Sequence, residues 1–200
     1  MTRFGIDLLG WIFNSYPGYL IANFENLHPD FCVTLTEMKL FLRMEVCFMN
    51  FHAKLCEDVD VVDSDRLCRF VDMRSLKEDC DVILGDLRIG PGDENFVYKL
   101  KKVTYLFGRL IVKKTTFRSL RDAVPKLTYI ASLNESSPVI ELNSNKNMTN
   151  AMLKNMKHII SKGELYSLIY SNHPNLTKKF KLYDIQYIPP MDFYGGDFGW

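Results

Sequence analysis

The chain has 200 residues, 47% of them hydrophobic and 24% charged, which is typical of a globular protein with a sizeable core. Its 25 basic and 24 acidic residues nearly cancel to a formal net charge of +1, so the chain has no basic field that could hold nucleic acid. No apolar run has the length of a membrane-spanning helix, and we expect no transmembrane segment in these residues.

The first 31 residues predict a turn and one short strand. The N-terminus is apolar, but Asp7 interrupts the apolar run and no small-residue cleavage site follows, so no signal peptide is evident. The segment 14–18 is Asn-Ser-Tyr-Pro-Gly, a strong turn signal, and the apolar segment Tyr19 to Ala22 follows it. We expect a turn and then a strand that ends at Asn23.

A helix is predicted after this strand. Thr34 and Glu37 have the spacing of a capping box, in which the Thr34 hydroxyl accepts from the Glu37 amide and the Glu37 side chain reaches back. The apolar residues that follow share one helical face: Leu35, Met38, Phe41, Leu42 and Val46. The stretch 57–65 holds five acidic residues and is expected to be a connector. A second short helix is expected from Leu67 to Leu76.

All five cysteines lie between positions 32 and 80. They could close short loops, from Cys32 to Cys56 and from Cys68 to Cys80, as in a small cross-linked connector between better-packed elements. The fifth, Cys47, lies in an apolar stretch, where a free cysteine behaves as a small hydrophobe.

A zinc site is the alternative for two of these cysteines. His28 with Cys32, and His52 with Cys56, form two His-x3-Cys pairs, a spacing that places both members of a pair on one helical face. Pro29 argues against a helix at the first pair, because proline biases the residue before it to extended geometry. We expect no metal site and no cofactor, and zinc binding by these two pairs stays the alternative to disulfides.

Three N-glycosylation acceptor motifs occur in polar, loop-like stretches of the last 70 residues. Their asparagines are Asn134, Asn147 and Asn175, each followed two positions later by Ser or Thr. Their number favours a secreted protein with glycans at these positions.

A sequence motif that predicts a strand recurs in the second half of the chain. Residues 82–89 are Val-Ile-Leu-Gly-Asp-Leu-Arg-Ile, and residues 105–112 are Tyr-Leu-Phe-Gly-Arg-Leu-Ile-Val. Gly85 and Gly108 are 23 positions apart, a period typical of solenoid coils that each add a strand to a stacked parallel sheet. Further strands are expected at 139–142 and 166–170, followed by asparagines that suit tight corners. Ordinary turns between antiparallel strands are the alternative.

The two ends of the chain also share a pattern. Residues 19–32 and 167–176 both contain a Leu-Ile pair and, after it, an asparagine and a His-Pro pair. The match predicts that residues 1–57 are the C-terminal remnant of one domain with its helix, and that 58–66 form a connector. Residues 67–188 are then a complete second domain, and 189–200 are a tail.

These segments resemble the receptor L domain, the ligand-binding module of insulin and EGF receptors. The resemblance is carried by residues 80–89, 100–103 and 108–112, and it continues through 120–127 and 130–132. Residues 26–34, 37–38, 41–42 and 53–56 resemble nematode proteins with tandem receptor L domains. The resemblance implies a mainly β fold with short helices, a right-handed parallel β-helix with leucine-rich-repeat-like coils. It also implies disulfides between Cys32 and Cys56 and between Cys68 and Cys80.

The resemblance further implies a non-catalytic extracellular or secreted domain that binds a protein or peptide ligand on a sheet face. Tyr98, Tyr105 and Tyr129 are candidate contacts, although each is equally able to lie in a core. An enzyme is disfavoured, because Asp81 and Asp86 are five apart and would point to opposite faces of a strand. The remaining alternative is an intracellular scaffold for protein interactions, with reduced cysteines.

Overall fold

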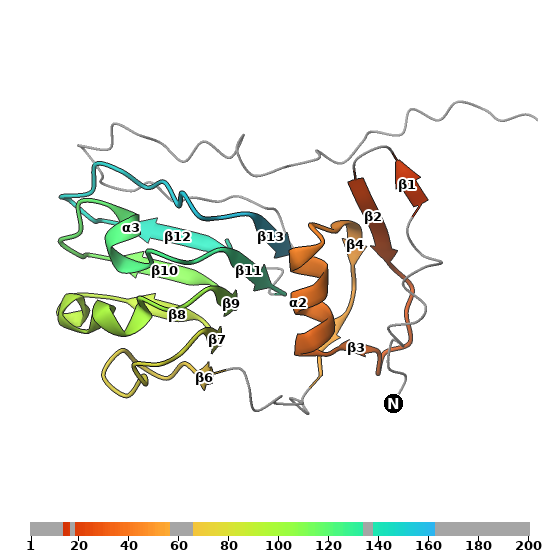
Figure 1. Cartoon of the computed structure of the whole chain (residues 1–200), viewed down its shortest axis with the longest axis horizontal. Coiled ribbons are helices and arrows are strands. Elements are labelled where there is room, and N and C mark those ends of the chain that lie inside the picture. Colours follow the sequence, from red (N-terminus) through yellow and green to blue (C-terminus); the bar gives the residue numbers. More distant parts are fainter. Residues whose placement is uncertain (1–13, 17–18, 57–65, 134–137, 163–200) are drawn as a thin grey trace, which may run out of the picture.

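The computed structural model describes residues 14–16, 19–56, 66–133 and 138–162, which form a mainly β structure with few short helices (Figure 1). Residues 19–56, here called the N-terminal unit, contain helix α2 (Leu35–Arg43) and short strands. The described residues from 66 onward form two small parallel sheets. Among the described residues, no helix has the length and apolar character needed to cross a membrane.

The N-terminal unit contributes strands to two small sheets, and the first of these also includes a strand from residues 14–16, before the unit. Strand β1 (Asn14–Tyr16) pairs antiparallel with β2 (Tyr19–Phe24), which pairs parallel with β4 (Cys47–Phe51). Strand β3 (Cys32–Val33) pairs parallel with β5 (Lys54–Leu55). The predicted strand at 19–22 is confirmed as part of β2, whereas Asn14 to Tyr16, expected in a turn, pair as a strand.

The predicted capping box is present at the start of α2. Glu37 N–H donates to the Thr34 hydroxyl at 3.2 Å, and the Glu37 carboxylate accepts from Thr34 N–H at 2.8 Å. The helix ends at Arg43, and Glu45 takes a left-handed conformation with φ 54° that turns the chain toward β4. Its buried apolar residues, Met38, Phe41 and Leu42, are among those that the helical spacing predicts.

The first parallel sheet has five strands in the order β13-β11-β9-β7-β6. They are β6 (Leu67–Arg69), β7 (Val82–Leu84), β9 (Tyr105–Phe107), β11 (Tyr129–Ser132) and β13 (His158–Ser161). In register across the sheet, Val82 pairs with Tyr105, Tyr105 with Tyr129, and Tyr129 with His158. Each layer of this sheet is thus one further passage of the chain.

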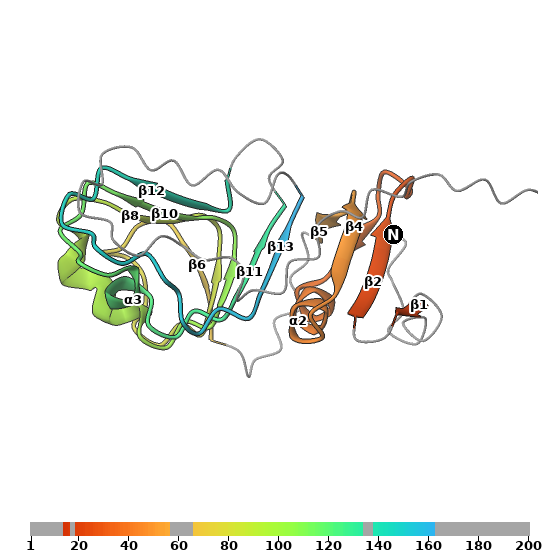
Figure 2. The same ribbon diagram turned by 90° about the horizontal axis from the view of Figure 1, so that it is seen from above.

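The second parallel sheet has three strands in the order β12-β10-β8. They are β8 (Leu87–Ile89), β10 (Leu110–Lys113) and β12 (Ile140–Asn143). A 3-10 helix, η2 (Asp93–Leu100), and helix α3 (Leu120–Ala123) lie at the end of the molecule away from α2 (Figures 1 and 2). The predicted strand at 139–142 is confirmed by β12, and the expected strand at 166–170 lies outside the described residues.

Each copy of the recurring motif, at 82–89 and at 105–112, forms two strands in different sheets and not the single strand that was expected. The chain leaves β7 for β8 at Gly85 and leaves β9 for β10 at Gly108, where φ is +108° and +151°. A Cβ at Gly108 would overlap the carbonyl oxygen of Gly85 in the layer below. At Gly108 the stacked corners leave no room for a Cβ, and at Gly85 the positive φ favours glycine.

The helix expected from Leu67 to Leu76 is wrong. Leu67 to Arg69 form β6, and turns follow, with the Asp72 carboxylate accepting from Ser75 N–H at 2.8 Å. Pairing with β7 and burial of Cys68 outweigh the weak helical preference of this segment, because tertiary contacts routinely override propensity.

The core of the parallel part lies between the two sheets. It is lined by one alternate set of strand residues, including Ile83, Leu106 and Ile130 from the first sheet and Leu87 and Leu110 from the second. All five are fully buried. Since side chains alternate along a strand, the neighbouring residues of the first sheet point out of this core.

Candidate functional site

The outward-pointing side of the five-stranded sheet is apolar. We call it the outer face and define it by Leu67, Val82, Leu84, Tyr105, Phe107, Tyr129, Ala131, His158 and Ile160. The rings of Tyr105 and Tyr129 stack in adjacent strands with centroids 4.9 Å apart. Phe107 is 3% exposed and Ala131 is 2% exposed, so this face is covered in the structure.

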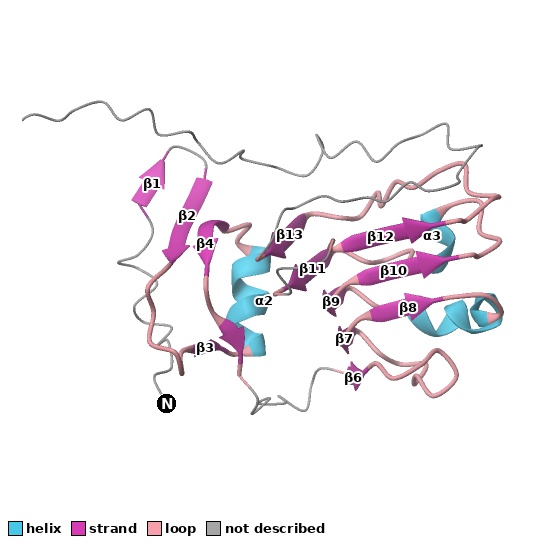
Figure 3. Ribbon diagram, turned by 180° about the vertical axis from the view of Figure 1, so that it is seen from behind, coloured by secondary structure: helices cyan, strands magenta, loops and turns pink. Residues whose placement is uncertain are grey.

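Helix α2 provides the cover (Figures 2 and 3). Met38, Phe41 and Leu42 share one hydrophobic cluster with Phe107 and Ala131 of the outer face. The Lys39 ammonium lies 5.5 Å from the centroid of the Tyr105 ring, a cation–π distance. The N-terminal unit is therefore packed on the sheet and not merely tethered beside it.

His158 links β13 to the N-terminal unit. Its Nε2 lies 2.9 Å from the Val46 carbonyl oxygen, which can only accept, so Nε2 carries the hydrogen. The opposite nitrogen, Nδ1, is buried and has no hydrogen-bond partner in the structure. Burial lowers the pKa of His158 below its ordinary value, although the Val46 hydrogen bond and the charge of Glu45 act in the other direction.

The three candidate tyrosines do not gather at one place. Tyr105 and Tyr129 lie side by side on the outer face and are half-buried. Tyr98 lies on η2 and is exposed, and its hydroxyl donates to the Glu78 carboxylate at 3.2 Å. The structure thus joins two of the three candidates into one aromatic surface and separates the third.

The two aspartates considered for catalysis are each held by a different arginine. Arg66 donates to Asp81 through Nε at 3.0 Å, and Arg109 donates to Asp86 through its guanidinium at 2.6 Å and its amide at 3.1 Å. Partial burial alone would raise the pKa of Asp86, but the hydrogen bonds and charge of Arg109 outweigh it and lower the pKa. This arrangement suits ion pairing and not proton transfer between two carboxyl groups.

The family model for the receptor L domain matches residues 79–187, more than half of the 200 residues. The chain belongs to the receptor L domain family. The match includes every strand from β7 onward, and it leaves out β6 and the N-terminal unit. No curated protein and no solved structure matches the chain.

Two disulfides are present in this receptor L domain protein. Cys32 is joined to Cys56 across the ends of β3 and β5, and Cys68 is joined to Cys80 beside the five-stranded sheet. These are the two pairs that the resemblance implies. The sulfurs of Cys32 and Cys56 are therefore not free as thiolates, which overturns the zinc alternative. Cys47 is a free thiol, and burial, with the charge of Glu45, raises its pKa.

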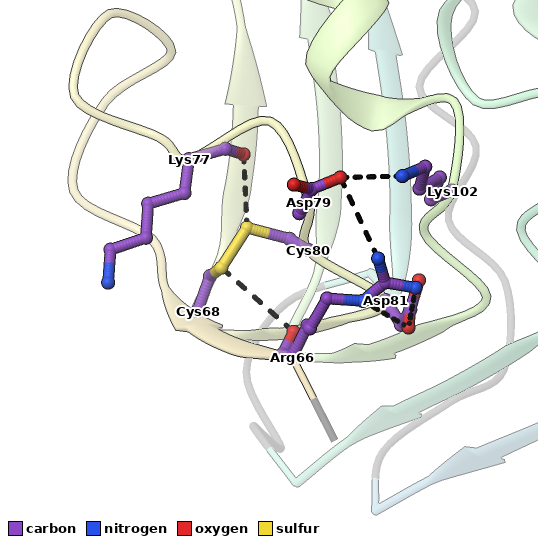
Figure 4. A network of polar contacts seen from close by, with 7 residues as sticks. All are labelled: Arg66, Cys68, Lys77, Asp79, Cys80, Asp81 and Lys102. Atoms are coloured by element: carbon purple, nitrogen blue, oxygen red, sulfur yellow. Dashed lines mark hydrogen bonds and ion pairs between the residues drawn. A yellow bond between two sulfur atoms is a disulfide. The ribbon is translucent and has the colours of Figure 1, made fainter. Parts of the chain in front are cut away.

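An ion-pair network surrounds the second disulfide (Figure 4). Arg66 lies 2.9 Å from Asp81 and 3.6 Å from Asp79, and Lys102 donates to Asp79 at 2.5 Å. The hydrogen bond from Lys102 lowers the pKa of Asp79. Because these groups are largely solvent-exposed and pair with one another, they stabilise the start of the sheet only modestly.

Of the three predicted glycosylation sites, one lies in the described residues. Asn147 is exposed, Met148 beside it is fully buried, and Thr149 Oγ1 donates to the Arg118 carbonyl at 3.2 Å. The asparagine is thus accessible on an anchored backbone. Asn134 and Asn175 lie outside the described residues.

Sequence reasoning did not identify His158 or the covered outer face. A usable signal was present, because β7 and β9 are apolar at every position and not at alternate positions. Strands of that kind are buried on both faces. The pattern therefore predicts a covering element, although it does not say which segment supplies it.

Proposed function

We propose that this chain is a non-catalytic extracellular domain that binds a protein or peptide ligand through the outer face. The observation that carries the proposal is the stacked pair Tyr105 and Tyr129, half-buried on a parallel sheet that keeps them in register. Aromatic side chains with part of their surface open are enriched at protein-binding hot spots. Membership of the receptor L domain family favours the same role.

The fold that we propose for residues 67–188 is a complete right-handed parallel β-helix with leucine-rich-repeat-like coils. Its support is the parallel register of two sheets, in which Leu87, Leu110 and Ile140 stack across one sheet as Val82, Tyr105 and Tyr129 stack across the other. In this proposal, residues 1–57 are the remnant of a preceding receptor L domain, 58–66 are a connector and 189–200 are a tail.

An extracellular location is supported by the chemistry of the chain. Disulfides persist in oxidising compartments and are rare in the cytosol. Two disulfides in the structure and an exposed Asn147 in a glycosylation motif fit a secreted glycoprotein. We propose glycans at Asn134, Asn147 and Asn175.

The test is secretion of the full chain from a eukaryotic host, followed by a thiol count and a binding screen against a panel of secreted proteins and peptides. We expect one free thiol, Cys47, and a binding partner whose affinity falls about tenfold or more in Tyr129→Ala or Tyr105→Ala. Tyr98→Ala is the matched control and should bind normally, because Tyr98 lies away from the outer face on η2. Five free thiols, or binding that depends on Tyr98 and not on Tyr129, would contradict the proposal.

A further inference from the structure

We propose that the N-terminal unit is a releasable cover for the outer face, and that protonation of His158 releases it. The inference extends the proposed function, since the covered surface is the proposed binding face.

The N-terminal unit is held together by its own bonds. Strand β2 pairs with β4, β3 pairs with β5, and the Cys32–Cys56 disulfide closes the unit within residues 19–56. Within the unit, the Phe24 ring packs against the rings of Phe31 and Phe51. The unit can therefore leave the sheet without the loss of these internal contacts.

The contact with the sheet is made mainly by apolar side chains, and a hydrogen bond crosses it. Met38 and Leu42 belong to the same hydrophobic cluster as Phe107 and Ala131, and His158 donates to the carbonyl of Val46. Val46 is fully buried, and His158 is 5% exposed. A charge that develops on His158 is thus placed inside this contact and not at its margin.

A second proton on His158 has one place to bind. Nε2 already carries the hydrogen donated to Val46, so the added proton must go to Nδ1. Nδ1 is buried without a partner, and its new N–H would find no acceptor there. Once the unit leaves the sheet, water can solvate both nitrogens, so protonation favours the uncovered state.

The charged and titratable groups around His158 come from each element packed against it. Glu45, after α2, attracts the protonated ring, but burial outweighs that attraction. Helix α2 contributes Lys39, which lies over the Tyr105 ring, two strands away from His158. Strand β4 begins with the thiol of Cys47, and β11 places Tyr129 beside His158 in register. None of these four side chains is a hydrogen-bond partner of Nδ1 in the structure.

The direction of the pH effect follows from the lowered pKa of His158 in the covered state. Covering is strongest above the ordinary histidine pKa of about 6.5 and weakens as the pH falls below it. Between the ordinary and the lowered pKa, the equilibrium constant for covering falls by about tenfold per pH unit. Below the lowered pKa it levels off.

The experiment is hydroxyl-radical footprinting of the full chain, with disulfides intact, at about pH 7.5 and about pH 5.5. Met38, fully buried, and Phe107, 3% exposed, report uncovering of the contact. We expect their labelling to rise several-fold at the lower pH, up to about tenfold per pH unit below 6.5, without change in far-UV circular dichroism. Labelling that is independent of pH would overturn the inference.

Three variants separate His158 from other causes. His158→Gln keeps a donor for Val46 but gains no proton, so its labelling should not change with pH. His52→Gln is the matched control, because His52 is exposed, and it should behave as the wild type. Ala131→Glu places a large charged side chain on the outer face, which should displace the N-terminal unit. In this variant, Met38 should be labelled strongly at both pH values. A pH response that persists in His158→Gln would overturn the inference.

The outcomes also separate this inference from the proposed function. No ligand is used, so a failed binding screen leaves the footprinting result unaffected and removes only the proposed function. Ligand binding that depends on Tyr129, together with footprints that do not change with pH, would refute the releasable cover but support the proposed binding face.

Discussion

Asn145 joins two layers of the parallel part, and its replacement by alanine is expected to destabilise the domain strongly. The side chain is fully buried after β12. Its Oδ1 accepts from the Thr115 amide at 2.9 Å and from the Thr115 hydroxyl at 2.8 Å, and its Nδ2 donates to the Val112 carbonyl at 2.9 Å. At about 1 kcal/mol for each hydrogen bond, and more for a buried group left without a partner, the loss is about 3–5 kcal/mol.

Urea denaturation of unglycosylated protein measures this loss. Thr115→Val removes the hydroxyl bond and keeps the amide bond, so it should cost about 1 kcal/mol. Asn147→Ala is the matched control, since Asn147 is exposed two positions away, and it should change the free energy of unfolding by less than about 0.5 kcal/mol. A loss below about 1 kcal/mol in Asn145→Ala would refute the assignment of a layer-joining role.

Three further changes test other parts of the structure. Gly108→Ala should lower the free energy of unfolding by more than about 2 kcal/mol. Gly92→Ala is the comparison: its added Cβ would meet no atom within 4 Å, and it should lower the free energy of unfolding by about 1 kcal/mol. Equal losses in the two variants would contradict the stacked corners. Replacing Cys68 and Cys80 by alanine should cost about 3 kcal/mol in denaturant titrations, from a sequence separation of 12, and no loss would show that this disulfide is absent in solution. Because the pKa of Asp86 is lowered in the folded protein, the ionised side chain stabilises the fold fully above the ordinary pKa of about 3.9, and this stabilisation is lost as the pH falls through the lowered pKa. In Asp86→Asn, the free energy of unfolding should therefore fall less steeply at acidic pH than in the wild type. An unchanged decrease at acidic pH would count against the ion pair.

Local signals in the sequence predicted the elements that depend on local chemistry. The capping box at Thr34 and the recurring glycines at 85 and 108 mark features that each segment carries within itself. The change of sheet at those glycines was not predicted, because it depends on which strands of neighbouring layers pair, and pairing between layers is not visible in a local segment. The segment 67–76 failed for a similar reason, since pairing with β7 decides its conformation.

The corner asparagines were predicted in kind but not in detail. The left-handed residue after β12 is Ser144, with φ 55°, and Asn145 uses its side chain to reach the neighbouring layer. The candidate site was predicted only in part: Tyr105 and Tyr129 were named, but His158 and the cover were not. Both depend on contacts between segments far apart in the sequence, such as the His158–Val46 contact across 112 positions, and a single sequence gives no direct measure of such contacts.

The outer face is tested most directly by a photoreactive phenylalanine analogue placed at Tyr129 in the secreted chain, with the same analogue at Tyr98 as the control. Without ligand, we expect the analogue at position 129 to cross-link to α2, because α2 covers this face. With the ligand from the binding screen, we expect cross-links from position 129 to the ligand and none from position 98. Ligand cross-links from position 98 alone would contradict the account.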